Sequence, residues 1–352
     1  MITRADMSRE LDPSPSSPTK TFIIEAHTEE PEDFLAHMVG KDALEKTADA
    51  YLYRLHLPDG IVWVDQLDER FWSVHTGISM RTANSFLKKQ VERYRELDWI
   101  WLPSNHLRNM WPNAIPKRVR TSFNGQNLLG PGSPARNLKV QLYGDGADRL
   151  LDYISQDEQY RSAVSFDSVQ NTVVDPDFGI LEEGVSRMGR FAATGNSFEF
   201  HLQFVRAVVE RYKAFVLLCE SKSIGYSAYS DGGGSLTGGP IGVRFSRQIE
   251  DLSGFLAELF SSRHPYRLWG IPEIHDGYAT VDAVDLHIGS RVRLDIGSDW
   301  LRIYLTQGCC GNSVARLVAN LQHTFDGALR LDDPELQDAL NGNFSALQGG
   351  AN

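Results

Sequence analysis

The sequence predicts an α+β protein of three related modules with mostly antiparallel sheets, two modules clear and one diverged. Three observations support this class. A stretch ending in Val-Glu-Arg-Tyr occurs twice, β-rich runs are joined by turn residues, and apolar residues elsewhere recur at three- and four-residue steps. The length of 352 residues suits two or three modules of about 100–150 residues. Each module is expected to follow the order β-α-β-β-β-α, and the three could pack pseudo-symmetrically.

The repeat lies in residues 75–94 and returns without a gap in residues 193–212. The identical positions are Thr76/Thr194, Gly77/Gly195, Ser79/Ser197, Phe86/Phe204, Val91/Val209, Glu92/Glu210, Arg93/Arg211 and Tyr94/Tyr212. A chain that leaves a strand to enter a helix needs a glycine, and then a side chain that accepts the first free amide hydrogens. We therefore expect Ser79, Ser197 and their counterpart Ser313 to cap helices.

The first module is predicted for residues 21–103, after a tail of residues 1–20. The tail is rich in proline and serine and has little to bury, so we expect it to be disordered. Within the module, Asp59-Gly60 between two β-rich runs indicates a hairpin. The apolar spacing of residues 82–96 predicts a helix, and a last short strand follows it.

An insert rich in proline and glycine is predicted for residues 104–137, with at most a short strand at residues 119–123. The chain has a net charge of −11, yet it contains no Asp or Glu between Trp99 and Gly144. The candidate binding residues in and beside this basic insert are Arg108, Trp111, Lys117, Arg118, Arg120, Arg136 and Lys139.

Three interpretations of the basic insert stay open. Basic side chains beside aromatic rings can hold phosphates and stack on bases. The same composition can dock on an acidic surface of a partner protein. The insert can also lie across the acidic body of this protein or be solvated, as charged segments commonly are.

The second module, residues 138–223, is predicted to repeat the order of the first. Its last element is predicted as a closing strand in the apolar run at residues 214–221. A glycine-rich linker of residues 224–240 follows, and pattern alone indicates a diverged third module in residues 241–331. Residues 332–352 are expected to form a tail that includes a short helix.

Composition excludes several classes of protein. An acidic chain repels nucleic acid and anionic membranes, apart from the basic insert. No run reaches the roughly 18 apolar residues of a membrane span, and no basic region followed by an apolar core marks a secretory signal. The three cysteines give no disulfide framework, so we expect reduced thiols and a cytoplasmic location.

Two sequence motifs offer weak candidates for catalysis. Glu220-x-Lys222 follows an apolar run, and a carboxylate followed by a lysine on such a strand is typical of metal-dependent nucleases. Cys310 and Arg316 have the spacing that cysteine phosphatases use to cradle a phosphate. A non-catalytic interpretation is favoured for both motifs. Glu220 and Lys222 would lie at a strand end that meets solvent, and Cys310 would be a small residue at a crowded turn.

No other motif indicates a cofactor. The glycine-rich linker lacks the Gly-Lys-Ser/Thr of a P-loop, no histidines fall in metal-binding motifs, and no two cysteines have zinc-ligand spacing. The sequence therefore predicts no metal site and no cofactor, except Mg²⁺ if the nuclease interpretation holds.

The leading hypothesis is a non-enzymatic interaction or scaffold subunit of a cytoplasmic complex. It would bind a protein partner or a copy of itself through its repeated modules and the basic insert. The alternative is a nucleic-acid-binding protein, or a metal-dependent nucleic-acid-processing protein that uses Glu220 and Lys222. Enzymatic activity is left open, and no membrane partner is expected.

Overall fold

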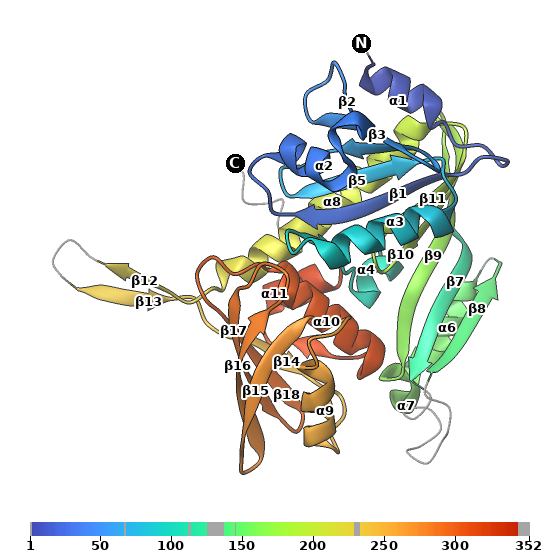
Figure 1. Ribbon diagram of the computed structural model, residues 1–352. Helices are drawn as coiled ribbons and strands as arrows, with labels where there is room; N and C mark the ends of the chain where they lie inside the picture. Colours follow the sequence, from blue (N-terminus) through green and yellow to red (C-terminus); the bar gives the residue numbers. More distant parts are fainter. Residues whose placement is uncertain are drawn as a thin grey trace.

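The computed structural model describes residues 2–66, 68–111, 114–124, 137–144, 146–228 and 233–343. Within these residues, an 11-stranded sheet, a 6-stranded sheet and a 2-stranded arm are all antiparallel (Figure 1). Helices pack against the two larger sheets. This architecture confirms the predicted α+β class. We call the 6-stranded sheet and its helices the C-terminal unit.

The N-terminal residues form the first half of the large sheet. Its elements are β1 (Thr19–Ala26), α2 (Pro31–Val39), the 3-10 turn η1 (Lys41–Ala43), β2 (Leu44–Lys46), β3 (Leu52–Leu57), β4 (Gly60–Asp65), β5 (Phe71–Thr76), α3 (Met80–Arg93) and β6 (Leu97–Trp99). Every residue of β1 is buried, because the strand pairs with β5 on one side and with two strands on the other. Helices α2 and α3 cover one face, where Leu35 and Leu87 pack with Ile24 and Trp72.

The middle of the chain completes the large sheet. Its elements are α4 (Ser104–Arg108), β7 (Ile115–Asn124), β8 (Asn137–Tyr143), α6 (Ala147–Gln156), α7 (Glu158–Arg161), β9 (Val164–Asp175), β10 (Gly179–Ser186), β11 (Arg190–Gly195) and α8 (Phe198–Ser221). The strands follow the order β2-β3-β4-β5-β1-β11-β10-β9-β7-β8. Helix α8 lies on the face opposite α3, where Val205 and Phe215 pack with Ile23 and Phe71 (Figure 1).

The predicted closing strand at residues 214–221 is wrong, because these residues form the last two turns of α8. Phe215, Val216 and Cys219 are fully buried, and they continue the apolar stripe that Tyr212 begins. Their three- and four-residue spacing is helical. A run rich in Phe, Val and Leu suits a buried strand by composition alone, but the packing of these side chains against the core favours the helix.

The last third of the chain forms the arm and the C-terminal unit. Its elements are β12 (Gly225–Ala228), β13 (Gly234–Thr237), β14 (Ile241–Arg244), α9 (Leu252–Leu259), β15 (Leu268–His275), β16 (Tyr278–Asp285), β17 (Arg291–Gly297), β18 (Trp300–Leu305), α10 (Asn312–Thr324), β19 (Arg330–Leu331) and α11 (Pro334–Leu340). Strands β12 and β13 pair only with each other among the described strands and project from the body (Figure 1). The predicted glycine-rich linker therefore contains an ordered hairpin.

The first and third predicted modules have the same order of elements and of strands. Each contains one strand more than predicted, β2 and β15, and the strand orders β2-β3-β4-β5-β1 and β15-β16-β17-β18-β14 correspond. The last short strand pairs with the first strand in both, β6 with β1 and β19 with β14. The middle segment differs, because its first strand β8 pairs with β7 and not with β11.

The predicted capping serine has that role in both copies of the Thr-Gly-x-Ser turn but not at the third position, Ser313. Ser79 caps α3 by accepting a hydrogen bond from Thr82 N, and Ser197 caps α8 by accepting from Phe200 N. The prediction for Ser313 is wrong. Gly311 occupies the N-cap of α10, and the Ser313 hydroxyl donates to Asp285 instead.

Of three further predictions about segments, two need correction and one is confirmed. Residues 4–10 of the expected disordered tail form helix α1 (Arg4–Glu10), which buries Met7 against Trp63 and Phe198. Among the described residues of the basic insert, 104–108 form α4 and 115–124 form the ten-residue strand β7, which is part of the sheet and longer than the short strand expected there. The predicted short C-terminal helix is present as α11, and the rest of that tail, residues 344–352, lies outside the described residues.

Candidate functional site

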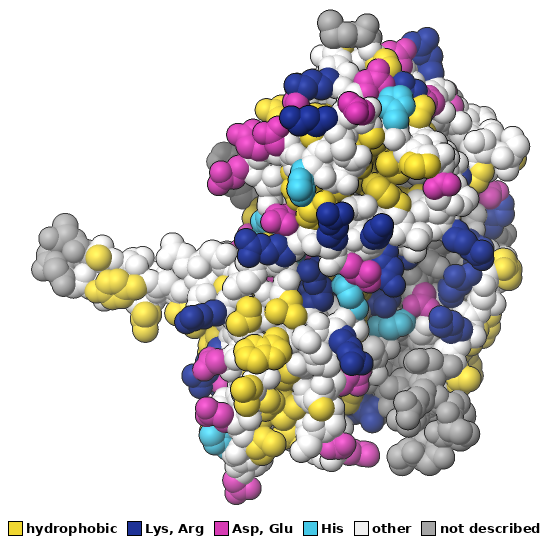
Figure 2. Space-filling model, viewed as in Figure 1, with side chains coloured by type: hydrophobic (Ala, Val, Ile, Leu, Met, Phe, Trp, Pro, Cys, Tyr) yellow, Lys and Arg dark blue, Asp and Glu magenta, His cyan; other side chains and the backbone are white. Residues whose placement is uncertain are grey.

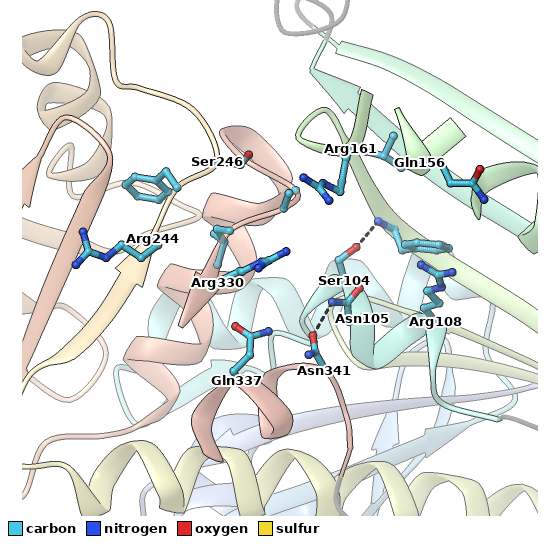
Figure 3. Close-up of a pocket in the computed structure, with 16 residues that line it drawn as sticks. Ser104, Asn105, Arg108, Gln156, Arg161, Arg244, Ser246, Arg330, Gln337 and Asn341 are labelled. Atoms are coloured by element: carbon cyan, nitrogen blue, oxygen red, sulfur yellow. Dashed lines mark hydrogen bonds between the residues drawn. The ribbon is translucent and has the colours of Figure 1, made fainter. Parts of the chain in front are cut away.

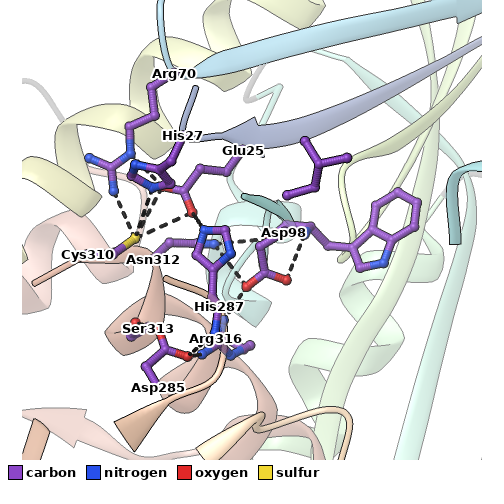
Figure 4. Close-up of polar contacts among 12 residues, drawn as sticks. Glu25, His27, Arg70, Asp98, Asp285, His287, Cys310, Asn312, Ser313 and Arg316 are labelled. Atoms are coloured by element: carbon purple, nitrogen blue, oxygen red, sulfur yellow. Dashed lines mark hydrogen bonds and ion pairs between the residues drawn. The ribbon is translucent and has the colours of Figure 1, made fainter. Parts of the chain in front are cut away.

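Polar side chains from the large sheet and the C-terminal unit meet in a buried cluster between them (Figure 4). We call this cluster the polar centre. Its members are Glu25, His27, Arg70, Asp98, Asp285, His287, Cys310, Asn312, Ser313 and Arg316. Burial of so many ionisable groups requires that they be paired, because an isolated charge is costly in an apolar interior.

Strand ends and turns position the large-sheet side of the polar centre. Glu25 lies near the end of β1 and His27 follows it two positions later, so both point to the same side of the strand. Arg70 immediately precedes β5, and Asp98 lies on β6. Both strands pair with β1, which brings these side chains together.

The C-terminal unit contributes the other side. Asp285 ends β16, and its Oδ1 accepts a hydrogen bond from the backbone N–H of His287, which fixes the following turn. Cys310 lies in the turn between β18 and α10, and Arg316 lies on α10. Asn312 donates to the backbone oxygen of Trp99 at 3.2 Å, which joins α10 to the large sheet.

Glu25 contacts four other members of the polar centre. Its Oε1 accepts from Arg70 Nε at 2.5 Å, and its Oε2 lies 3.1 Å from His287 Nε2. Cys310 Sγ lies 3.4 Å from both carboxylate oxygens and 3.6 Å from His27 Nε2. Arg70 Nη2 also reaches Cys310 Sγ at 3.0 Å. The donor atoms of Glu25, His27, His287 and Cys310 all lie within 4.8 Å of one another.

The pKa values of this group follow its burial and its charges. Burial favours a protonated Glu25, but His27, His287 and Arg70 outweigh it and hold the pKa of Glu25 well below its usual value. Burial, with the nearby Glu25 carboxylate, raises the pKa of the Cys310 thiol well above its usual value. Without a bound cation, Cys310 is therefore a neutral thiol at neutral pH.

Arg316 links two acidic groups at the base of the polar centre. Its guanidinium forms ion pairs with Asp98 and Asp285, and its Nε donates to Tyr266 O at 2.8 Å. All three ion-pairing side chains are fully buried. Burial opposes the charge, yet Asp285 and Asp98 raise the pKa of Arg316 above its usual value. The arginine therefore stays charged and neutralises part of the acidic cluster.

The structure argues against the phosphatase interpretation of Cys310 and Arg316. In a phosphate-cradling loop the arginine must face the bound anion beside the thiolate. Here Arg316 is saturated by two carboxylates and is fully buried. Cys310 faces Glu25, whose negative charge opposes an incoming phosphate.

Glu220 and Lys222 do not form a catalytic pair either. They lie at the end of α8, not on a strand, and each has a separate partner. Glu220 pairs with Arg70 at 2.7 Å and accepts from Gly311 N, whereas Lys222 pairs with Asp333 at 2.6 Å. Their common role in this structure is to tie α8 to its neighbours.

A second site is a cavity of about 930 Å³ between the two units, lined by side chains of both (Figure 3). It is lined by Ser104, Asn105, Arg108, Gln156, Arg161, Val164, Phe166, Arg244, Phe245, Ser246, Gly327, Ala328, Leu329, Arg330, Gln337 and Asn341. Four of these are arginines and none is acidic, in a chain whose net charge is −11. The cavity lining is therefore positively charged, although the net charge of the protein is negative.

The arginines come from both walls of the cavity. Arg108 at the end of α4 and Arg161 at the end of α7 belong to the large-sheet side, and Arg330 on β19 belongs to the C-terminal unit (Figure 3). Arg244 lies beside Phe245 and pairs with Asp332 at 3.1 Å. Asn105 donates to Asn341 across the junction at 2.7 Å, so the two walls are also in direct contact.

The other candidates from the basic insert lie in different surroundings. Trp111 packs edge-on against Phe204 of α8, with ring centres 5.5 Å apart. Lys117 pairs with Glu182 of β10, and Arg120 donates to Gln141 of β8. Arg118 and Lys139 lie on the same β7–β8 hairpin, and Arg136 lies outside the described residues. Of the predicted binding residues that the structure describes, Arg108 alone lines the cavity.

Sequence reasoning missed Glu25, His27, His287 and the other cavity arginines. One local signal was available, because Glu25-x-His27 at the end of an apolar strand places two metal-binding side chains on one face. The remaining residues come from elements far apart in the chain. Only the fold brings them together.

Comparisons with known proteins place this architecture in context. A family model described as "MJECL33-like protein" matches residues 8–339. The uncharacterized protein MJECL33 of Methanocaldococcus jannaschii is 23% identical over 356 residues, which cover 89% of this chain and 86% of that protein. No solved structure matches the chain. Among the described residues, no helix is both long and apolar enough to cross a membrane.

Proposed function

The chain belongs to the MJECL33-like family, whose name states no activity, and we propose from the geometry that it binds a phosphate-bearing ligand in the arginine-lined cavity. One observation carries the proposal. Arg108, Arg161 and Arg330 surround a single cavity whose lining contains no carboxylate. Guanidinium groups bind phosphate through paired, charge-assisted hydrogen bonds, so they favour phosphates over neutral ligands.

The size and lining of the cavity indicate a ligand of about nucleotide size. Its volume of about 930 Å³ lies near the upper end of the roughly 300–1,000 Å³ of small-molecule sites. The amide side chains of Gln156, Gln337 and Asn341 supply donors and acceptors, while Phe166 and Phe245 supply an apolar wall. A nucleotide and the phosphorylated end of a single nucleic acid strand share this chemistry.

Titration calorimetry with nucleotides, and fluorescence anisotropy with 5′-phosphorylated single strands, test the proposal. We expect saturable binding that weakens with salt. In Arg330→Ala, loss of one charge-assisted contact should weaken binding about tenfold to a hundredfold. Arg120→Ala removes a similar exposed arginine outside the cavity, so it should bind as the wild type does.

The outcomes of this experiment identify the class of ligand and the place where it binds. Binding by nucleotides alone identifies a nucleotide site, and binding by strands alone identifies a nucleic acid end. If neither binds at low salt, the proposal is wrong. If Arg120→Ala loses as much affinity as Arg330→Ala, binding occurs through the β7–β8 hairpin and not through the cavity.

Self-association is a second candidate function, favoured by exposed apolar residues on the arm and on the C-terminal unit. Tyr226 on β12 is 64% exposed and Leu236 on β13 is 79% exposed. Trp269 and Ile271 on β15 are 52% and 72% exposed. Figure 2 shows hydrophobic side chains on both the arm and the neighbouring C-terminal unit.

A second copy of the chain is the occupant that fits these surfaces. A lone two-stranded hairpin is only marginally stable in water, so the arm is expected to need a supporting surface. Its described residues are uncharged, and the exposed Trp269 and Ile271 of β15 on another copy offer an apolar surface to it. This supports the scaffold hypothesis in the form of arm exchange between copies.

Light scattering coupled to size-exclusion chromatography tests self-association. The wild type should be a dimer or larger, and Tyr226→Ser with Leu236→Ser should be a monomer of unchanged fold. A monomeric wild type at tens of micromolar would contradict arm exchange. We also propose a cytoplasmic location, which the three free cysteine thiols support.

A further inference from the structure

We propose that Glu25, His27, His287 and Cys310 bind a single divalent transition metal ion, with zinc as the best match, and that this ion joins the two units. This inference goes beyond ligand binding in the cavity and does not depend on it. The four side chains provide one carboxylate, two imidazoles and one thiolate, which is a ligand set suited to zinc and its neighbours and not to Mg²⁺ or Ca²⁺.

Several distances between the donor atoms are close to the edges of a zinc coordination tetrahedron, and no two of the four ligand atoms are more than 4.8 Å apart. Zinc lies about 2.0–2.2 Å from nitrogen or oxygen and about 2.3 Å from sulfur, so tetrahedral edges are about 3.3–3.6 Å. His287 Nε2 to Glu25 Oε2 is 3.1 Å, and His27 Nε2 to Glu25 Oε1 is 3.4 Å. Cys310 Sγ lies 3.4 Å from the carboxylate oxygens and 3.6 Å from His27 Nε2.

The state of His287 provides independent support. Its side chain is fully buried, Nδ1 has no hydrogen-bond partner among the described residues, and Nε2 contacts Glu25 at 3.1 Å without the alignment of a hydrogen bond. Buried polar atoms in folded proteins are almost always paired, so such an atom needs an explanation. Coordination of a metal by Nε2, which faces Glu25, gives that atom its partner.

The surrounding charges are balanced for a divalent ion. Ionised Glu25 and the Cys310 thiolate together neutralise a charge of +2, and a metal deprotonates a thiol that it binds. Arg70 contacts both ligands from outside, which orients them as outer partners of metal ligands commonly do. Its own charge is offset by Glu220 at 2.7 Å.

Four protein ligands make a closed site, which is typical of structural zinc and leaves no position for a substrate. Glu25 and His27 belong to the large sheet, whereas His287 and Cys310 belong to the C-terminal unit. The ion therefore fixes one unit against the other. We infer a structural role, with thermal stability that depends on the metal.

Metal analysis of the purified full chain, with any affinity tag removed, is the direct test. We expect about one equivalent of zinc or a related metal per chain, or the same stoichiometry after reconstitution. Replacement by Co²⁺ should give the near-ultraviolet charge-transfer band of a thiolate ligand and the visible bands of tetrahedral cobalt. This spectrum is measured on the wild type, so it does not depend on the folding of a variant.

Three variants locate the site. Cys310→Ser should remove the thiolate band, while Cys309→Ser, which changes the adjacent buried cysteine outside the cluster, should keep it. His27→Ala changes the one ligand that is partly exposed, with 30% of its side chain accessible, so its fold should survive. Its metal affinity should fall about tenfold or more.

A chelator should lower the melting temperature of the wild type and leave that of folded Cys310→Ser unchanged. The proposal is overturned if the wild type binds no Co²⁺ after reconstitution. It is also overturned if Cys310→Ser keeps the thiolate band, or if His27→Ala binds metal as tightly as the wild type.

Discussion

Cys310 Sγ lies 3.4 Å from both carboxylate oxygens of Glu25, although the two residues are separated by most of the chain. Glu25 is fully buried at the end of β1, and Cys310 is nearly so in the turn before α10. Such a contact requires the large sheet and the C-terminal unit to hold a fixed relative position. The buried ion pairs of Arg316 with Asp98 of the large sheet and Asp285 of the C-terminal unit help to hold the two units in this position.

Replacement of Arg316 by Leu should strongly destabilise the protein. The substitution leaves Asp98 and Asp285 buried without their common partner, and breaking a buried ion pair in this way costs about 3–5 kcal/mol. Urea unfolding followed by circular dichroism measures the loss. Arg293→Ala, which removes a 54% exposed arginine, is the control and should change stability by less than about 1 kcal/mol. Equal effects of the two variants would contradict this account.

Replacement of Tyr212 by Phe should destabilise the protein, although only one oxygen is lost. The Tyr212 hydroxyl donates to Asn312 and accepts from Trp101 N at 3.0 Å, so its removal leaves buried polar atoms unpaired. The expected cost is about 1–3 kcal/mol in the free energy of unfolding.

The repeat supplies a matched control for Tyr212. Tyr94 occupies the same place in the first copy, but its buried hydroxyl has no hydrogen-bond partner among the described residues. Tyr94→Phe should therefore be neutral or slightly stabilising, because it removes an unsatisfied group. A loss of stability in Tyr94→Phe as large as that in Tyr212→Phe would show that the hydrogen bonds are not the cause.

His106 should make stability depend on pH below neutrality. It is fully buried and bonded to Ala339 O at 2.5 Å, and burial lowers its pKa to about 4. The unfolded chain, with a pKa of about 6.5, binds the proton first, so this stability is complete above about pH 6.5 and is lost towards pH 4. Over that range the loss is about 3 kcal/mol.

Comparison with a variant isolates the contribution of His106. Thermal melts from pH 7.5 to pH 4.5 should show a shallower decline for His106→Gln, which can still donate to Ala339 O. His275→Gln, which changes an exposed histidine on β15, is the control and should decline with pH as the wild type does. Parallel profiles for the wild type and His106→Gln would rule out this source of pH dependence.

Helix α1 should contribute directly to the stability of the core. Met7 is fully buried against Trp63, Phe198 and Leu202. Met7→Ala therefore leaves a cavity, which costs about 2–5 kcal/mol in the free energy of unfolding. Chemical denaturation measures this cost. Arg9→Ala, on the exposed face of the same helix, should fall within about 0.5 kcal/mol of the wild type. If the two variants are equally stable, α1 does not pack as described.

Local patterns predict much of the fold but not its exceptions. Alternating apolar residues and turn signals predict the hairpins, and helical spacing predicts α3 and α10. Helix α1 was missed because it offers only Met7 and Leu11 to the core, and its start depends on a capping box between Thr3 and Asp6. The last turns of α8 were missed because their apolar residues are equally suited to a buried strand.

The sites could not be predicted in the same way, because their geometry is made by long-range pairing. Arg108 at the end of α4 and Arg330 on β19 line the same cavity, although these two elements are far apart in the sequence. Likewise, the neighbours of Cys310 come from β1 and from the segment before β5. A spacing rule can detect a motif within one turn, but it contains no information about which distant turns meet.

The position of β1 has a consequence for synthesis of the protein. One edge of this strand pairs with β5 and part of the other with β6, while residues 19–22 pair with β11, which the ribosome makes much later. At about 5–20 residues per second, the roughly 170 residues between β1 and β11 take on the order of 10–35 s to synthesise, and that edge waits this long for its partner. During this interval the nascent chain presents an open strand edge with unpaired backbone N–H and C=O groups, a place where misassembly with other chains is favoured. Chaperone demand should therefore peak midway through translation and end when β11 emerges.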